Sequence, residues 1–142
     1  MPTRNGSARY EGLGKDGQGS VSTQSGVLKD QRYGFGTRFG AEPGTNPEEL
    51  IAAAHASCFT MALSFALAGA GYSDGVLETT AKVTVDKDGD GFTITKSALD
   101  LKAKVSGIDA EEFERIALDA KANCPVSKVL NAEITLTHAL ES

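Results

Sequence analysis

Residues 47–68 constrain the possible folds of this chain more than any other part of its sequence. The stretch contains no glycine, although ten of the 16 glycines fall within the first 44 residues. Asn46 is a favourable N-cap, Pro47 suits the first helical position, and Glu49 stands three residues after the cap. The helix predicted here is apolar on nearly every side, so we expect it to be buried all round.

A helix of these 22 residues would also be long enough to cross a bilayer. Alanine dominates it, however, and polar residues such as His55 and Ser57 interrupt it, while the rest of the chain is polar and rich in strand patterns. We therefore predict the central helix of a soluble core, with no membrane among the partners. Because 142 residues offer little material to cover every side of such a helix, a second subunit is the expected source of further cover.

Charge and the N-terminal sequence restrict the partners and the compartment. The formal net charge is −5 and the Lys and Arg residues are scattered, so no nucleic acid partner is expected. The polar first ten residues lack the apolar stretch of a signal peptide, which makes the cytoplasm the expected compartment. In that reducing environment Cys58 and Cys124 are expected to be thiols or a cycling pair rather than a structural disulfide.

The glycine-rich N-terminal third is predicted to form an antiparallel meander of about three strands. Aromatic residues alternate with glycine and arginine between Tyr33 and Phe39, which predicts a strand that ends with Arg38 facing away from the aromatics. A second alternating segment runs from Val21 to Val27, and the glycine-rich residues before it suit a hairpin connection.

The residues after the central helix predict a second hairpin. Alternating apolar residues begin at Leu77, and residues 87–91 form the turn. The parity of the apolar positions shifts beyond the turn, which indicates a bulge near Ser97.

The last third of the chain predicts a helix, a short helical turn and a final strand. Asp109 caps the helix, whose apolar face ends at Cys124, and residues 134–140 alternate as a strand. The whole chain, residues 1–142, is predicted to be a single α+β domain without internal repeats.

Three patterns that look like ligand motifs are not expected to bind a cofactor or a metal. Residues 12–17 match the GxGxxG dinucleotide pattern, but a strand is predicted to follow them where that site needs a helix, so a hairpin is favoured. Residues 86–91 open like a calcium loop, yet Ser97 stands where a bidentate Glu belongs, so a tight turn is favoured. The two histidines and two cysteines lack the paired spacing of zinc sites.

The two cysteines by themselves leave two interpretations open. Cys58 suits a small apolar residue in a buried helix, and Cys124 suits an inward-facing position at a helix end. The same positions are equally compatible with a two-cysteine redox site. Composition and spacing do not decide between these interpretations.

Four segments of the chain favour the redox interpretation. They are Thr37-Arg38-Phe39, Pro43-Gly-Thr-Asn-Pro-Glu-Glu-Leu50, His55-Ala-Ser-Cys58-Phe59 and Asn123-Cys124-Pro-Val-Ser127. In this order, over essentially the whole chain, they resemble the OsmC/Ohr family of thiol peroxidases, and within it the osmotically inducible OsmC branch. The resemblance implies an OsmC-like intertwined homodimer with two active sites at the subunit interface. It also implies an antioxidant oxidoreductase that reduces organic hydroperoxides and hydrogen peroxide.

The resemblance assigns roles to four side chains. Cys58 would be the peroxidatic thiol and Cys124 the resolving thiol, while Arg38 would be the thiolate partner and Glu48 the carboxylate that orients it. These residue types suit the chemistry, because burial raises the pKa of a thiol and a permanently charged guanidinium can reverse that shift. The reductant implied is a dihydrolipoyl group. His55 could act as a base, but a hydrogen-bonded helix histidine is preferred, since the resemblance gives it no shared role.

A non-catalytic function competes with the peroxidase hypothesis. A small-ligand-binding or redox-sensing dimer would form the Cys58–Cys124 bond only as a signal. Stoichiometry separates the two classes, because an enzyme supplied with reductant consumes many equivalents of peroxide per subunit and a sensor stops at one.

Helix geometry indicates which subunit supplies Glu48. The ten residues from Glu48 to Cys58 correspond to about 15 Å along a continuous helix, farther than a Glu side chain reaches. Residues 50–57 contain neither Gly nor Pro to break that helix. We therefore expect Glu48, and Arg38 with it, to complete the site from the partner chain.

Overall fold

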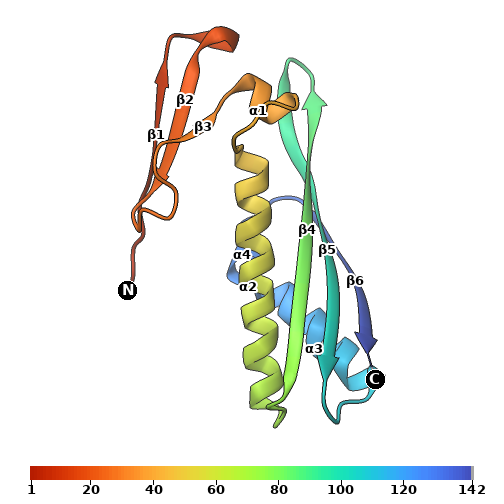
Figure 1. Cartoon of the computed structure of the whole chain (residues 1–142). Coiled ribbons are helices and arrows are strands. Elements are labelled where there is room, and N and C mark those ends of the chain that lie inside the picture. The colour runs from red at the N-terminus through yellow and green to blue at the C-terminus, as the bar shows by residue number, and fades with distance from the viewer. Residues whose placement is uncertain (142) are drawn as a thin grey trace. The chain divides into compact units, whose positions relative to one another are not determined.

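The computed structural model describes residues 1–141, which form two compact units. The first unit spans Met1–Leu50 and the second begins at Ile51. Helices and strands occur in both (Figure 1), which confirms the predicted α+β class. That residues 1–142 act as one domain stays a prediction.

The first unit contains a three-stranded antiparallel sheet in the order β1-β2-β3. The strands are β1 (Gly6–Glu11), β2 (Gln18–Thr23) and β3 (Gln31–Tyr33). The predicted meander is confirmed, and the GxGxxG pattern lies in the hairpin between β1 and β2. β2 ends earlier than predicted, because the backbone of Thr23 bonds to Gly26 (3.0 Å) and Leu28 (2.9 Å) and closes a turn.

The prediction of a strand through Arg38 is wrong. Residues Phe35–Phe39 form the short helix α1, and Gly34 precedes it. The Thr37 hydroxyl accepts the N–H of Gly34 (2.8 Å) and donates to the Gly34 carbonyl (3.1 Å). The rings of Phe35 and Phe39 pack with centroids 5.2 Å apart, because residues four apart share one face of a helix. Gly34 and Gly36, on either side of Phe35, imitate a strand pattern only because they carry no side chain.

Helix α2 (Pro47–Gly69) begins and ends where the sequence predicts. Asn46 Oδ1 accepts the backbone N–H of Glu49 at 2.8 Å, which confirms Asn46 as the N-cap. The Glu49 carboxylate accepts the hydroxyl of Thr45 at 2.8 Å. Asn46 Nδ2 donates to the Thr37 carbonyl at 3.0 Å, so the start of α2 is fastened to α1.

The second unit is built on a sheet in the order β4-β5-β6. Its elements are β4 (Gly75–Asp88), β5 (Gly91–Val105), α3 (Ala110–Asn123), α4 (Pro125–Val129) and β6 (Glu133–Glu141), together with most of α2. The predicted hairpin of β4 and β5 is confirmed, and β6 runs parallel to β5. The register of the hairpin shifts at Thr84 and skips Thr95, which confirms a bulge near Ser97.

The core of the second unit lies between α2, α3 and one face of this sheet (Figure 1). Every second residue of β5 from Ser97 to Val105 is buried. Phe59 and Leu63 of α2 and Phe113 of α3 are fully buried in the same cluster. The α3 face and its Asp109 cap are as predicted.

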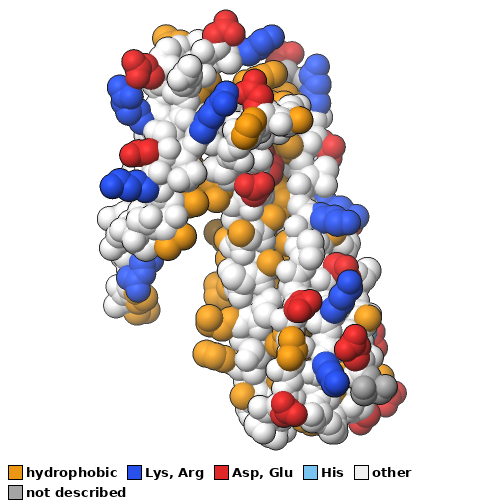
Figure 2. Space-filling view, viewed as in Figure 1, with side chains coloured by type: hydrophobic (Ala, Val, Ile, Leu, Met, Phe, Trp, Pro, Cys, Tyr) orange, Lys and Arg blue, Asp and Glu red, His pale blue; other side chains and the backbone are white. Residues whose placement is uncertain are grey.

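Within one chain α2 is not buried all round, and burial of its remaining side by a second subunit stays a prediction. Phe59 and Leu63 are 0% exposed, whereas Met61 is 61% and Phe65 73% exposed. Figure 2 shows hydrophobic side chains exposed along α2. Although α2 is long and apolar enough to cross a membrane by length and composition, its other side packs into the core of the second unit, as the core helix of a soluble protein does.

Candidate active site

Two elements of the second unit carry the predicted redox cysteines. Cys58 lies in the middle of α2, and Cys124 lies at the junction where α3 ends and α4 begins. Pro125 occupies the first turn of α4, and a residue before proline avoids the helical conformation, which explains the break at Cys124 (φ −56°, ψ 127°). The predicted inward-facing position of Cys124 is confirmed, since this residue is fully buried.

The side chains of Cys58 and Cys124 lie close enough for each to shift the pKa of the other, although 66 residues separate them in the sequence. Both are free thiols. Cys124 is 0% exposed, whereas Cys58 is partly exposed. A reagent arriving from solvent therefore reaches Cys58 before it reaches Cys124.

The two thiols differ in how firmly they hold a proton. Burial raises the pKa of Cys58 by more than a backbone hydrogen bond from Val126 lowers it, and the neighbouring Cys124 raises it further. Burial also raises the pKa of Cys124, but hydrogen bonds from the backbone and hydroxyl of Ser127, from Cys58 and from the backbone of Val126 lower it further than burial raises it. Within the second unit the thiolate is therefore favoured on Cys124.

His55 lies one helical turn before Cys58 and is fully buried. Its Nδ1 is 2.6 Å from Ser97 Oγ on β5, and its Nε2 is 2.8 Å from Ser127 Oγ on α4. Burial lowers the pKa of His55, which favours the neutral imidazole. The prediction of a hydrogen-bonded helix histidine is confirmed.

The two serine partners of His55 are site residues that the sequence patterns did not predict. Ser127 stands three residues after Cys124, and that spacing across a helix start is a signal that could have identified it. Ser97 has no comparable signal, because only the packing of α2 on β5 brings it to His55, 42 residues away.

Arg38 and Glu48 form a two-point ion pair in the first unit. Arg38 Nε and Nη2 donate to Glu48 Oε1 and Oε2, each at 2.9 Å. Glu48 is buried, and its hydrogen bonds raise the pKa of Arg38. The guanidinium carbon also lies 5.1 Å from the ring centroid of Phe39. The structure therefore brings the four predicted site residues together as two pairs, one in each unit.

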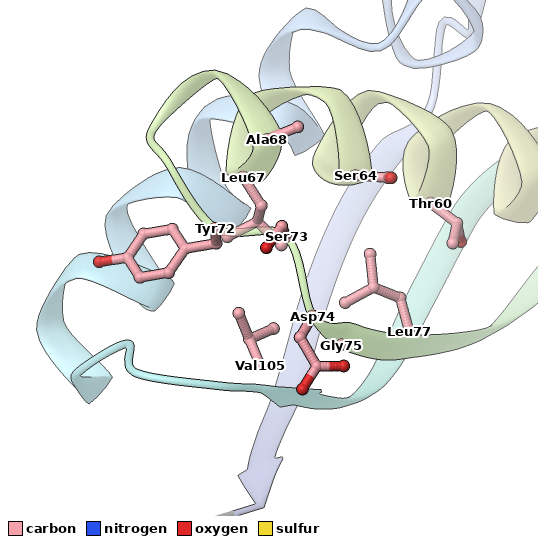
Figure 3. A pocket seen from close by; sticks show the side chains of 10 residues that line it. All are labelled: Thr60, Ser64, Leu67, Ala68, Tyr72, Ser73, Asp74, Gly75, Leu77 and Val105. Atoms are coloured by element: carbon pink, nitrogen blue, oxygen red, sulfur yellow. The ribbon is translucent and has the colours of Figure 1, made fainter.

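A hollow of about 360 Å³ in the second unit is separate from the thiols (Figure 3). Its lining consists of Thr60, Ser64, Leu67, Ala68, Tyr72, Ser73, Asp74, Gly75, Leu77 and Val105. Neither the two cysteines nor His55 contributes to this lining, so the hollow is not part of the candidate active site.

The described residues show no arrangement suited to a metal ion. Over residues 1–141, no three His, Cys, Asp or Glu side chains gather in such a way. In the turn that resembles a calcium loop, Asp86 and Asp88 accept hydrogen bonds from the hydroxyls of Thr95 (2.5 Å) and Thr93 (2.7 Å). This segment is the tight β4–β5 turn that the sequence predicts.

Comparison with known proteins places the chain in a family. Residues 40–139 match the family model described as OsmC-like protein. This chain belongs to the OsmC-like family. Peroxiredoxin OsmC of Escherichia coli (strain K12) is 57% identical to it over 139 residues, which cover 98% of this chain and 97% of that protein. The resemblance seen in the four sequence segments is confirmed.

Organic hydroperoxide resistance (Ohr) proteins are also similar to this chain. The organic hydroperoxide resistance protein OhrA of Bacillus subtilis (strain 168) is 36% identical over 98 residues, which cover 68% of this chain and 67% of OhrA. The crystal structure of the organic hydroperoxide resistance protein OhrB of Bacillus subtilis matches with a TM-score of 0.70 at 27% identity, covering 98% of each chain. The predicted OsmC-like fold of the chain is confirmed.

Proposed function

We propose that this protein is a thiol-dependent peroxidase that reduces organic hydroperoxides and hydrogen peroxide and so protects against oxidative stress. The observation that carries the proposal is the proximity of the partly exposed Cys58 to the buried Cys124. A thiol open to peroxide beside a second thiol shielded from it suits a peroxidatic and a resolving cysteine. The names of the Escherichia coli and Bacillus subtilis relatives support the same activity.

The reaction takes two steps at these sulfurs. The Cys58 thiolate attacks a peroxide oxygen and the O–O bond breaks, so that Cys58 becomes a sulfenic acid while the departing alkoxide or hydroxide takes up a proton. The Cys124 thiolate then attacks Cys58 Sγ, the S–O bond breaks, and the hydroxide leaves as water after gaining a proton. An external dithiol returns two electrons to the Cys58–Cys124 disulfide and regenerates both thiols.

Arg38 is the cation that shifts the thiolate to Cys58 in this proposal. Cys58 needs such a cation, because burial and the neighbouring Cys124 both raise its pKa. A guanidinium stays protonated throughout, so it stabilises the thiolate without exchanging protons. Glu48 holds the guanidinium at two points and so sets its orientation.

The unbroken helix α2 supports a site completed by a second subunit. Since α2 runs from Pro47 to Gly69, Glu48 and Cys58 of one chain are about 15 Å apart along its axis. A Glu side chain does not span that distance. We therefore assign to each Cys58 the Arg38–Glu48 pair of the partner chain in a homodimer.

The exposed side of α2 supports the homodimer independently. A shallow apolar groove there is lined by Ala53, Ala56, Ser57, Thr60, Met61, Ser64, Phe65 and Thr79. Met61 and Phe65 of this lining are exposed, and soluble chains rarely leave such an apolar surface uncovered. A second copy of the chain, presenting the same helix, is the proposed cover.

Dilution tests the homodimer. Because the apolar side of α2 needs a partner, we expect the protein to stay dimeric until it unfolds, with no folded monomer in between. Sedimentation velocity and circular dichroism over one dilution series measure assembly and folding together. A monomer that keeps its helical signal at low concentration would contradict the prediction.

Peroxide turnover tests the function. With cumene hydroperoxide and excess dihydrolipoamide, we expect each subunit to consume many equivalents of peroxide, because the dithiol regenerates both cysteines. Thioredoxin in place of dihydrolipoamide is expected to support less turnover. Consumption that stops at one equivalent per subunit with either donor would identify a redox sensor instead of an enzyme.

The proposed reductant also favours a compartment. A cycling dithiol enzyme requires surroundings that keep both cysteines reduced between turnovers, and the cytoplasm does so. We therefore assign the protein to the cytoplasm, with a dihydrolipoyl group as its electron donor.

A further inference from the structure

His55 is a buried titratable group to which the two reaction steps assign no role. Both of its ring nitrogens have serine hydroxyl partners, Ser97 at 2.6 Å and Ser127 at 2.8 Å. The Ser127 hydroxyl also lies near enough to the Cys124 side chain to lower its pKa. A continuous chain of polar atoms therefore runs from the resolving thiol through Ser127 to the imidazole and on to Ser97.

We propose that His55 is a positioning residue for the resolving step, which accepts through the Ser127 hydroxyl the proton that Cys124 loses before attacking the Cys58 sulfenic acid. The inference rests on the proposed peroxidase function and assigns the proton of its second step. It concerns the buried thiol, whose proton passes to an internal acceptor faster than to bulk solvent.

The protons and electrons of this step balance as follows. Cys124 gives its proton to Ser127 Oγ while Ser127 passes its own proton to His55 Nε2. The Cys124 sulfur then forms the S–S bond with Cys58, the S–O bond breaks, and hydroxide takes a proton and leaves as water. When the imidazolium releases its extra proton, one thiol and one sulfenic acid have become one disulfide and one water.

The surroundings of His55 suit a transient proton acceptor. The groups that face its ring nitrogens are Ser97 from β5 and Ser127 from α4, and neither carries a charge. Burial alone lowers the pKa of His55, so the imidazole is neutral at rest and gives up an accepted proton readily. Once it is protonated, its Nδ1–H donates to Ser97 Oγ, and the new Cys124 thiolate supplies the opposite charge.

The experiment follows the two steps separately in the full chain. Reduced protein is mixed with one equivalent of cumene hydroperoxide, and rapid quenching with intact-mass spectrometry measures sulfenic acid and then disulfide. Ser127→Ala removes the hydroxyl that links Cys124 to His55. His55→Gln removes the base but keeps a polar side chain. At neutral pH we expect both variants to form sulfenic acid at the unaltered rate and the disulfide about tenfold more slowly.

The pH profile distinguishes proton transfer through Ser127 and His55 from a purely structural role of these two residues. In the unaltered protein, closure of the disulfide should change little from about pH 7 to about pH 8, because the imidazole is neutral across this range. In both variants the rate should rise by about tenfold per pH unit, since only solvent then produces the attacking thiolate. The defect should therefore shrink as the pH is raised.

Tyr72→Phe is the matched control, because it removes a hydroxyl that donates to Glu112 (2.7 Å) elsewhere in the same unit. It should leave both steps unchanged. Disulfide closure at the unaltered rate and pH dependence in Ser127→Ala overturns the proposal, even if His55→Gln does not fold. Equal slowing of both steps also overturns it and shows a structural role. An unaltered protein that forms no sulfenic acid contradicts the proposed function itself, and the proton transfer with it.

Discussion

The Cys58→Ser protein is expected to consume no peroxide, whereas the Cys124→Ser protein reacts once and then stalls as a sulfenic acid. The reason is that Cys58 is the thiol open to solvent, while Cys124 acts only in the second step. Intact-mass spectrometry after one equivalent of cumene hydroperoxide should show no added oxygen in the first variant. It should show one oxygen, at Cys58, in the second.

This comparison also determines which of the two cysteines is the reactive thiolate. Within the second unit the hydrogen bonds from Ser127 lower the pKa of Cys124 below that of an ordinary thiol, while the pKa of Cys58 is raised. If this preference decided the chemistry, Cys124 would be oxidised in the Cys58→Ser protein and Cys58 would stay inert in the reciprocal variant. That outcome would reverse the two roles and remove the need for Arg38.

A mixed dimer is expected to keep one working site when one subunit carries Cys58→Ser and the other carries Arg38→Ala with Glu48→Ala. If the ion pair acts across the interface, Cys58 of the second subunit meets the intact Arg38 and Glu48 of the first. Such a purified, non-exchanging heterodimer should retain about half the peroxidase activity of the unaltered dimer, since one of two symmetric sites is complete. Near-zero activity would refute supply across the interface.

The mirror-image heterodimer is the control. Here one subunit is unaltered and its partner carries all three substitutions, so the total number of changes is the same. Supply across the interface leaves this heterodimer without a complete site, because the only remaining Cys58 faces the altered pair. Supply within one chain leaves it with one site, so the two heterodimers give opposite results under the two arrangements.

Local sequence signals predicted the elements that carry the site. Asn46 and Pro47 marked the start of α2, and the Asp109 cap marked the start of α3. These signals are reliable because a cap satisfies backbone groups within three residues of itself, and no distant contact is needed. The position of Cys124 at a helix end followed from the proline after it for the same reason.

One prediction failed where a local pattern was ambiguous. Arg38 lies in α1 instead of a strand, because alternation with glycine fits both a strand and a helix whose aromatics are four residues apart. Within one chain helix α2 is exposed at Met61 and Phe65, which agrees with the expectation that 142 residues do not cover every side of it. Its cover by a second subunit stays a prediction.

The sequence by itself determined the α+β class, the boundaries of α2, the family of the chain and its pair of cysteines. Only the tertiary structure decided that Cys58 and Cys124 touch and that His55 bonds to Ser97 and Ser127, 42 and 72 residues away. It also decided that β6 pairs in parallel with β5. The physical reason is that caps and periodicity act within a few residues, whereas these contacts arise from the packing of α2 and α3 on one face of a sheet.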